Sequence, residues 1–187
     1  MYTLIFLNYA DIKVVRNDEG DEESQRDEED SEPEWGYDSF DGREYHSSDQ
    51  MGYSDKEFDE KCRYYRHQVI LTKGFFEPSD RFPPLWGGIS SLYDLEADAG
   101  KGLTVREFCA NLTSSCLNKY NQEVGLNVKL EHILRANYNP GSMSKFYITF
   151  AARESDSPDA PLEEYQAKAA WSAADKTYPI LCHNHHR

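Results

Sequence analysis

The sequence predicts an α+β fold in which one long helix packs across a four- to five-stranded antiparallel sheet, preceded by a disordered acidic N-terminal region. Three observations lead to this prediction. An amphipathic segment at residues 104–125 carries both a helix start signal and a helix stop signal. Segments with the two-residue alternation of strands follow it. The negative charge is confined to the first third of the chain, which sets that region apart from the rest.

The helix is expected to begin at Thr104 and to end at Gly125. Glu107 lies three residues after Thr104, which is the spacing of a capping box. A glycine can adopt the left-handed conformation that ends many helices. Apolar residues recur at spacings of three and four, so one face of the helix needs a partner. That stripe consists of Val105, Phe108, Cys109, Leu112, Cys116 and Tyr120.

Four strands are expected after the helix. In residues 127–138, simple alternation places His132 and Leu134 on the apolar face, where the histidine is read as a core residue rather than a metal ligand. Residues 144–153 and 164–171 alternate in the same way. The last strand, in TYPILC, is expected at an edge, because its proline cannot donate a hydrogen bond to a central ladder.

Shorter elements are expected ahead of the long helix. Residues 55–66 have the spacing of a short helix that marks the edge of the domain. Residues 68–73 are rich in β-branched side chains and predict a strand. Several Gly and Pro residues then break regular structure, and residues 89–95 are expected to be a short extended segment.

Charge divides the chain into two regions. Residues 1–60 carry 20 Asp or Glu against 5 Lys or Arg, whereas residues 61–187 carry 14 against 15. We therefore predict an acidic, largely disordered region over 1–60 and a folded domain over 61–187. Disorder is predicted most strongly for residues 18–32. The stretch that follows interleaves aromatic and acidic residues, a composition found both in interaction tails and in solvated spacers.

The four cysteines do not predict a disulfide framework. Cys109 and Cys116 share a helix face but lie two turns apart, which is too far for a bond, so they are expected to be buried thiols. The apolar run at the N-terminus lacks a basic leader and a cleavage site. No later segment approaches the length of a membrane span. The expected location is intracellular, either cytoplasmic or nuclear.

Several segments carry a resemblance to a known family. The helix segment CLNKYN at residues 116–121 looks like the helix signature of plant cystatins. KFYITFAARES and EYQAKAAW look like the two strands that follow the first inhibitory hairpin of that family. On these segments the chain resembles the plant cystatins and, more closely, the plant cystatin/monellin-like family of uncharacterised proteins. The resemblance runs from about residue 68 to residue 182, and RYYRHQVILTKGF is similar to a segment that the second family carries ahead of its cystatin-like part.

The resemblance implies a set of inhibitory segments, from which this sequence departs. Cystatins insert a glycine-containing trunk, a first hairpin of the form Gln-x-Val-x-Gly and a second hairpin with Pro-Trp into a papain-type active site. The trunk glycines correspond to Gly87 and Gly88. In the first hairpin, Asn137, Asn139 and Gly141 stand at the Gln, Val and Gly positions. The second hairpin has no Pro-Trp pair, because its tryptophan precedes the turn and its proline follows it.

The resemblance, together with these departures from it, leaves two hypotheses for function. The first is a non-catalytic, cystatin-like protein-interaction module with degenerate inhibitory hairpins, and the alternative is a divergent inhibitor of papain-like cysteine endopeptidases. We expect no enzyme activity and no cofactor, because the sequence contains no nucleophile elbow or phosphate loop. The tail with Cys182, His183, His185 and His186 is interpreted as a frayed end rather than a metal site. The near-neutral charge of the domain does not favour nucleic-acid binding. We expect a monomer whose partner is a protein.

Overall fold

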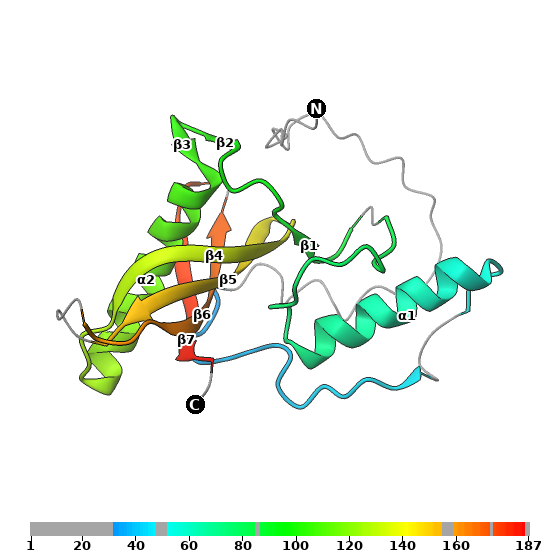
Figure 1. The fold of residues 1–187 in the computed structure, drawn as a ribbon, viewed down its shortest axis with the longest axis horizontal. Helices are drawn as coiled ribbons and strands as arrows, with labels where there is room; N and C mark the ends of the chain where they lie inside the picture. The colour runs from blue at the N-terminus through cyan, green and yellow to red at the C-terminus, as the bar shows by residue number, and fades with distance from the viewer. Residues whose placement is uncertain (1–31, 48–51, 85–86, 155–158, 173, 186–187) are drawn as a thin grey trace.

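The computed structural model describes residues 32–47, 52–84, 87–154, 159–172 and 174–185 (Figure 1). The described part of the chain contains two helices, a five-stranded antiparallel sheet and a two-stranded antiparallel sheet. This confirms the predicted α+β class. The elements in chain order are α1 (Lys56–Leu71), β1 (Ser90–Ser91), β2 (Asp98–Gly100), β3 (Leu103–Thr104), α2 (Val105–Val124), β4 (Lys129–Asn139), β5 (Met143–Arg153), β6 (Glu163–Ser172) and β7 (Thr177–Asn184).

The five-stranded sheet has the order β1-β4-β5-β6-β7, and α2 lies across one of its faces (Figure 1). The main core fills the space between α2 and the sheet. It takes its helix side from the predicted stripe and its sheet side from alternate residues of the strands. Its largest fully buried side chains include Leu112, Phe146, Ile148, Phe150 and Tyr165.

Both ends of α2 follow the sequence signals. The amide of Glu107 donates to Oγ1 of Thr104 at 3.2 Å, and the amide of Thr104 donates to Oε2 of Glu107 at 2.8 Å. These two bonds confirm the capping box. Gly125 ends the helix with φ of 68°, in the left-handed region. The helix therefore begins and ends where its sequence predicts.

The two central strands confirm simple alternation. In β5, Phe146, Ile148 and Phe150 face α2, while Tyr147 belongs to a second hydrophobic cluster. In β6, Tyr165, Ala167 and Ala169 face α2, and Lys168 is buried in contact with that second cluster. Because both faces of these strands are covered, even the residues on the polar face are buried.

In β4 the expected alternation holds for Leu130, Ala136 and Tyr138, and for Val128 just before the strand, all of which lie in or against the main core, but it is wrong for His132 and Leu134. The pairing with β5 shifts register twice, so that Glu131 and Leu134 are extra residues opposite an uninterrupted partner strand. Each bulge reverses the face of the residues after it. Ile133 is therefore the buried residue, at 2% exposure, whereas Leu134 is 40% exposed and His132 lies on the surface. The histidine predicted for the core is not there.

The strand predicted over residues 68–73 is also wrong. Helix α1 continues to Leu71, so the β-branched residues form its last turn and a half. The helix begins at Asp55, whose side chain accepts from the amide of Phe58 at 3.1 Å. It ends at Thr72, whose hydroxyl donates to the carbonyl of Gln68 at 2.7 Å. Val69 packs on the second cluster, and this contact outweighs the strand propensity of the segment.

The second cluster lies on the sheet face that α2 leaves open. Its buried members are Tyr65, Phe75, Phe76, Ile89 and Tyr147. They come from α1, from the loop after α1, from the residue before β1 and from β5. Figure 1 shows α1 on the opposite side of the sheet from α2. The sheet is thus covered on both faces, which four strands and one helix alone would not achieve.

Part of the N-terminal region is an integral component of this second layer. We call residues 34–41 the clasp. The amide of Gly36 donates to the carbonyl of Ile180 in β7 at 2.7 Å, and Asp38 is buried against β6. The expected boundary between residues 60 and 61 falls inside α1. The disorder predicted for residues 18–32 lies outside the described residues, Glu32 excepted.

Candidate functional site

The segments that the resemblance marks as inhibitory meet at one end of the sheet. β1 pairs antiparallel with the end of β4, with Ser90 opposite Tyr138, so the chain before β1 runs toward the β4–β5 hairpin. The β6–β7 turn lies at the same end, because β5 begins and β6 ends opposite each other. The side chains of Lys101 and Asp175 are 2.5 Å apart and join the β2–β3 turn to the β6–β7 turn.

Within this end of the sheet, the five predicted site residues have different environments. Gly87, Gly88 and Gly141 are exposed, and Asn139 pairs with Lys145 beside the hairpin turn. Asn137 is 2% exposed and lies away from the surface. The structure therefore brings the trunk glycines toward the hairpin tip, while the residue at the first position of the motif is part of the interior.

Asn137 attaches the loop after α1 to the sheet. Its side-chain amide donates to the carbonyl of Gly74 and to the carbonyl of Phe76, both at 2.8 Å. Gly74 packs so closely on Tyr147 that a β-carbon there would lie 2.7 Å from the ring. The Asn137 side chain thus holds the loop and the strand in contact.

Gly88 and Trp171 also have structural roles. A β-carbon on Gly88 would lie 2.9 Å from the hydroxyl of Tyr65, and its φ is +86°. That hydroxyl donates to the carbonyl of Ile89 and accepts from its amide, both at 2.8 Å. Trp171 packs edge-on against Phe108 of α2, with ring centroids 5.8 Å apart. It is partly buried against the main core, and its Nε1–H donates to Oδ1 of Asp175 in the β6–β7 turn at 3.2 Å.

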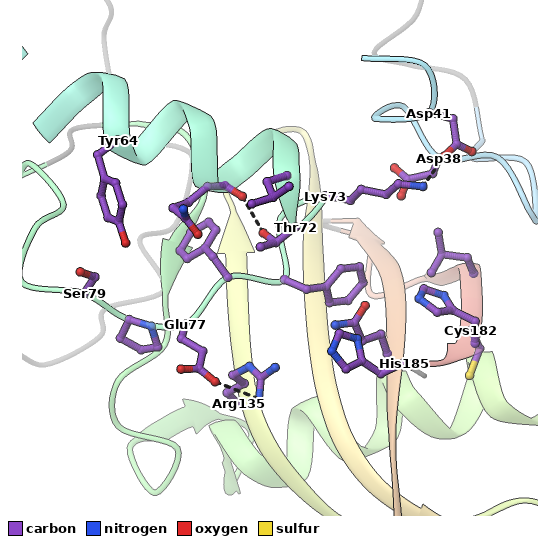
Figure 2. A pocket seen from close by; sticks show the side chains of 18 of the residues that line it. Asp38, Asp41, Tyr64, Thr72, Lys73, Glu77, Ser79, Arg135, Cys182 and His185 are labelled. Carbon is purple, nitrogen blue, oxygen red and sulfur yellow. Dashed lines mark hydrogen bonds and ion pairs between the residues drawn. The ribbon is translucent and has the colours of Figure 1, made fainter. Parts of the chain in front are cut away.

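A cleft of about 880 Å³ lies on the other face of the sheet (Figure 2). One wall is the C-terminal half of α1 with the loop at residues 72–79, and another is the clasp. The floor comes from β4, β6 and β7. Its charged and ionisable lining residues are Asp38, Asp41, Lys73, Glu77, Arg135, His183 and His185.

The charges around this cleft are arranged in pairs across its walls. Lys73 lies 2.5 Å from Asp41 of the clasp, and both side chains are about half exposed. The hydrogen bond from Lys73 holds the pKa of Asp41 below its ordinary value. Arg135 contacts Glu164 at 2.9 Å and lies 3.9 Å from Glu77 (Figure 2).

Lys168 is the most buried charged group beside the cleft. Its ammonium lies 2.8 Å from Oδ1 of Asp38, and the two side chains are 2% and 4% exposed. The rings of Phe40 and Tyr147 lie 5.3 Å and 5.1 Å from the same ammonium. Burial lowers the pKa of Lys168 from its ordinary value, while the hydrogen bond and the charge of Asp38 act in the opposite direction. Asp38 is thus the carboxylate that offsets the charge of this buried lysine.

The sequence alone does not single out Asp38 or Lys168. The lysine stands on the polar face of a predicted strand, and its partner lies 130 residues earlier in a region predicted to be largely disordered. The sequence feature that points to a packed segment here is the interleaving of aromatic and acidic residues around Trp35 and Phe40. Such a pattern fits a segment that packs by its rings and pairs by its carboxylates.

The cysteines are thiols inside the protein. All four are free and buried. Burial raises the pKa of Cys109 and of Cys116 to about 12, so both stay protonated at neutral pH. A protonated buried thiol is a packing group rather than a nucleophile.

The His-rich end of the chain lies beside the cleft. Cys182 packs in the main core and also lines the cleft, as do His183 and His185. Among the residues that the structure describes, no three His, Cys, Asp or Glu side chains gather closely enough for a metal ion. His186 lies outside the described residues. Neither of the described helices has the length and apolar character of a membrane span.

Searches with protein-family models, among curated proteins and among solved structures found no match to this chain.

Proposed function

We propose that this protein is a non-catalytic interaction module with a cystatin-like fold, whose inhibitory hairpins are degenerate and whose partner is another protein. The observation that carries the proposal is the position of Asn137. The resemblance assigns this residue to the start of the protease-binding motif, but its side chain is buried and bonded to Gly74 and Phe76. It cannot contact a protease without leaving the loop after α1 unattached.

The rest of the hairpin end supports the same proposal. Asn139 presents an amide where a cystatin presents an apolar side chain, and an amide is costly to desolvate in an enzyme cleft. Trp171, the aromatic residue nearest the second hairpin, packs on Phe108. An interface that loses its central aromatic anchor commonly loses most of its affinity.

A divergent papain-type inhibitor is the second candidate function. It is favoured by the pairing of β1 with the end of β4 and by the two hairpin turns at one end of the sheet, which is the arrangement that a three-part wedge requires. Under this alternative the exposed tip at Pro140 and Gly141 would enter the protease.

Titration of papain with the full chain separates the two candidates. We expect no inhibition up to ~10 µM chain, which corresponds to binding weaker than about −7 kcal/mol. A plant cystatin serves as the positive control, and Asn139→Val as a variant that restores one apolar contact. Inhibition by the unmodified chain below that concentration, lost on deletion of residues 140–141, would overturn the proposal and support the inhibitor.

A further inference from the structure

The clasp is held to the domain by contacts that resemble those of a bound peptide. It crosses the β7 edge, with Trp35 beside Lys119 of α2 and Phe40 beside Tyr147 on the opposite face. Between these rings, one backbone amide bonds to the edge strand and one carboxylate bonds to Lys168. A strand-edge hydrogen bond combined with side-chain contacts on either side is a recurring way to bind an extended peptide.

The turns of the clasp are formed by hydrogen bonds between its own residues. The amide of Phe40 donates to Oδ1 of Asp38 at 3.1 Å, and the amide of Asp41 donates to the carbonyl of Asp38 at 2.9 Å. Gly36 has φ of 83°, which a glycine adopts without strain. These local turns need no other part of the chain. A separate peptide with the same pattern of Trp-Gly, Asp and Phe can therefore form the same shape.

The surface beneath the clasp is suited to an acidic and aromatic ligand. Without the clasp it consists of the Lys168 ammonium, the Tyr147 ring and the edge of β7 around Ile180. We call these three groups the bay. A buried ammonium over an aromatic floor requires a carboxylate close by, and its surroundings favour a ring beside it. Lys73, which pairs with Asp41, adds a second positive charge next to the bay.

We propose that the bay is a peptide-binding site, that the clasp is its tethered occupant, and that an extended acidic and aromatic segment of a partner protein takes the place of the clasp. This rests on the proposed interaction function and names its surface and partner chemistry. The clasp also forms one wall of the neighbouring cleft, so its removal opens that cleft toward the bay. A partner segment longer than the clasp therefore has room to continue.

The tether explains why the clasp occupies the bay in the isolated protein. Residues 42–55 connect it to α1, and a short tether gives the tethered segment an effective concentration on the order of millimolar. A free peptide competes poorly with that concentration. A change that weakens only the clasp should therefore make the bay available to a free peptide.

The test uses the full chain and a fluorescein-labelled peptide of residues 33–43. The protein is prepared unchanged, as Asp38→Asn, and as the matched control Glu34→Gln, which alters an exposed carboxylate in the same segment. Fluorescence anisotropy should show the peptide binding the Asp38→Asn chain at least ~10-fold more tightly than the other two, because only that clasp has lost its buried carboxylate. A peptide with Asn at the position of Asp38 should not bind.

Equal binding of the peptide by all three proteins would overturn the inference, and so would equal binding of the two peptides.

A second measurement applies if Asp38→Asn does not fold. Hydrogen exchange of the unchanged chain should show the Gly36 amide exchanging at least ~100-fold faster than amides in β5 and β6. Exchange at the same rate would mean that the clasp opens only with the whole domain, which would also overturn the inference. The papain titration reports on the hairpin end, so a chain that inhibits papain yet binds the peptide would overturn only the proposed function.

Discussion

Two asparagines on β4 show how neighbouring residues can have opposite roles. Asn137 is buried and holds the loop after α1, whereas Asn139 lies at the hairpin and pairs with Lys145. A sequence motif that treats both as contact residues does not distinguish them. The distinction comes from the second layer, because it is the loop at Gly74 and Phe76 that covers Asn137.

Asn137→Ala should destabilise the fold by about 2–3 kcal/mol, because two buried carbonyl groups would lose their donor. Urea unfolding followed by circular dichroism measures this change. Asn139→Ala is the matched control and should alter the unfolding free energy little. Equal effects of the two substitutions would contradict the structural role given to Asn137.

The buried thiol of Cys116 predicts a specific pH dependence. Burial raises its folded-state pKa from 9.0 to about 12. A group with a raised folded pKa contributes stability that is fully present below its unfolded pKa and is lost as the pH rises toward the folded value. In the window from pH 9 to about 12 this thiol should therefore lower the unfolding free energy by about 1.4 kcal/mol per pH unit.

The measurement is urea unfolding of the unchanged chain and of Cys116→Ala at several values between pH 8 and pH 11. Because Tyr147 and Tyr165 are also buried and their pKa values are also raised, both proteins should lose stability with rising pH. The unchanged chain should lose it more steeply. Parallel curves would show that the thiol does not contribute.

At the scale of elements, the sequence predicted best where local signals and packing agree. The capping box and Gly125 define α2, and alternation defines β5 and β6, because these strands have no bulges. The face assignment failed at His132 and Leu134 of β4, where two bulges shift the register. A bulge depends on how the partner strand pairs, and a single segment does not contain that information.

Helix α1 shows the competition between propensity and packing. Its last residues, QVIL, have the side chains of a strand, and nothing in their immediate sequence selects a helix. Val69 faces Phe75, Phe76 and Tyr65 only if the helix continues to Leu71. The second cluster therefore determines the conformation, and it also contains Ile89 and Tyr147, which are distant in the sequence.

The connection before β1 offers a matched pair of substitutions. Gly88→Ala should cost about 1–3 kcal/mol of stability, because its φ of +86° is strained for alanine and the new carbon would press on the Tyr65 hydroxyl. Gly87→Ala meets no atom within 4 Å and should have little effect. Thermal or urea unfolding compares the two. A large loss at Gly87 instead would mean that the trunk glycines are required for another reason.

At the scale of the molecule, the fold is a sheet between two unequal layers. One is the helix α2, which the sequence predicted, and the other combines α1, the loop after it and the clasp. The amino-acid composition did not predict the clasp, because a region rich in Asp and Glu is expected to be a solvated, disordered chain. The buried pair of Asp38 with Lys168, the Gly36 hydrogen bond to β7 and the ring contacts of Trp35 and Phe40 attach part of that region to the domain.

Truncation tests the contribution of the clasp to the whole molecule. A chain that begins at residue 52 should unfold at a temperature about 6–12 °C below that of a chain that begins at Glu32, if loss of the Trp35 and Phe40 contacts costs about 3 kcal/mol. Differential scanning calorimetry measures both midpoints. Identical midpoints would show that the clasp adds no stability to the sheet.

The contact between Gly36 and β7 has a further consequence for how copies of the protein behave toward each other. The last strand of a sheet exposes backbone groups on which another chain can add. Here Pro179 has no N–H to offer, the register shifts beside it, and the clasp takes up the carbonyl of Ile180. Opening the clasp uncovers that edge together with the bay. A partner that holds the clasp open must therefore also shield β7, or two opened copies can associate edge to edge.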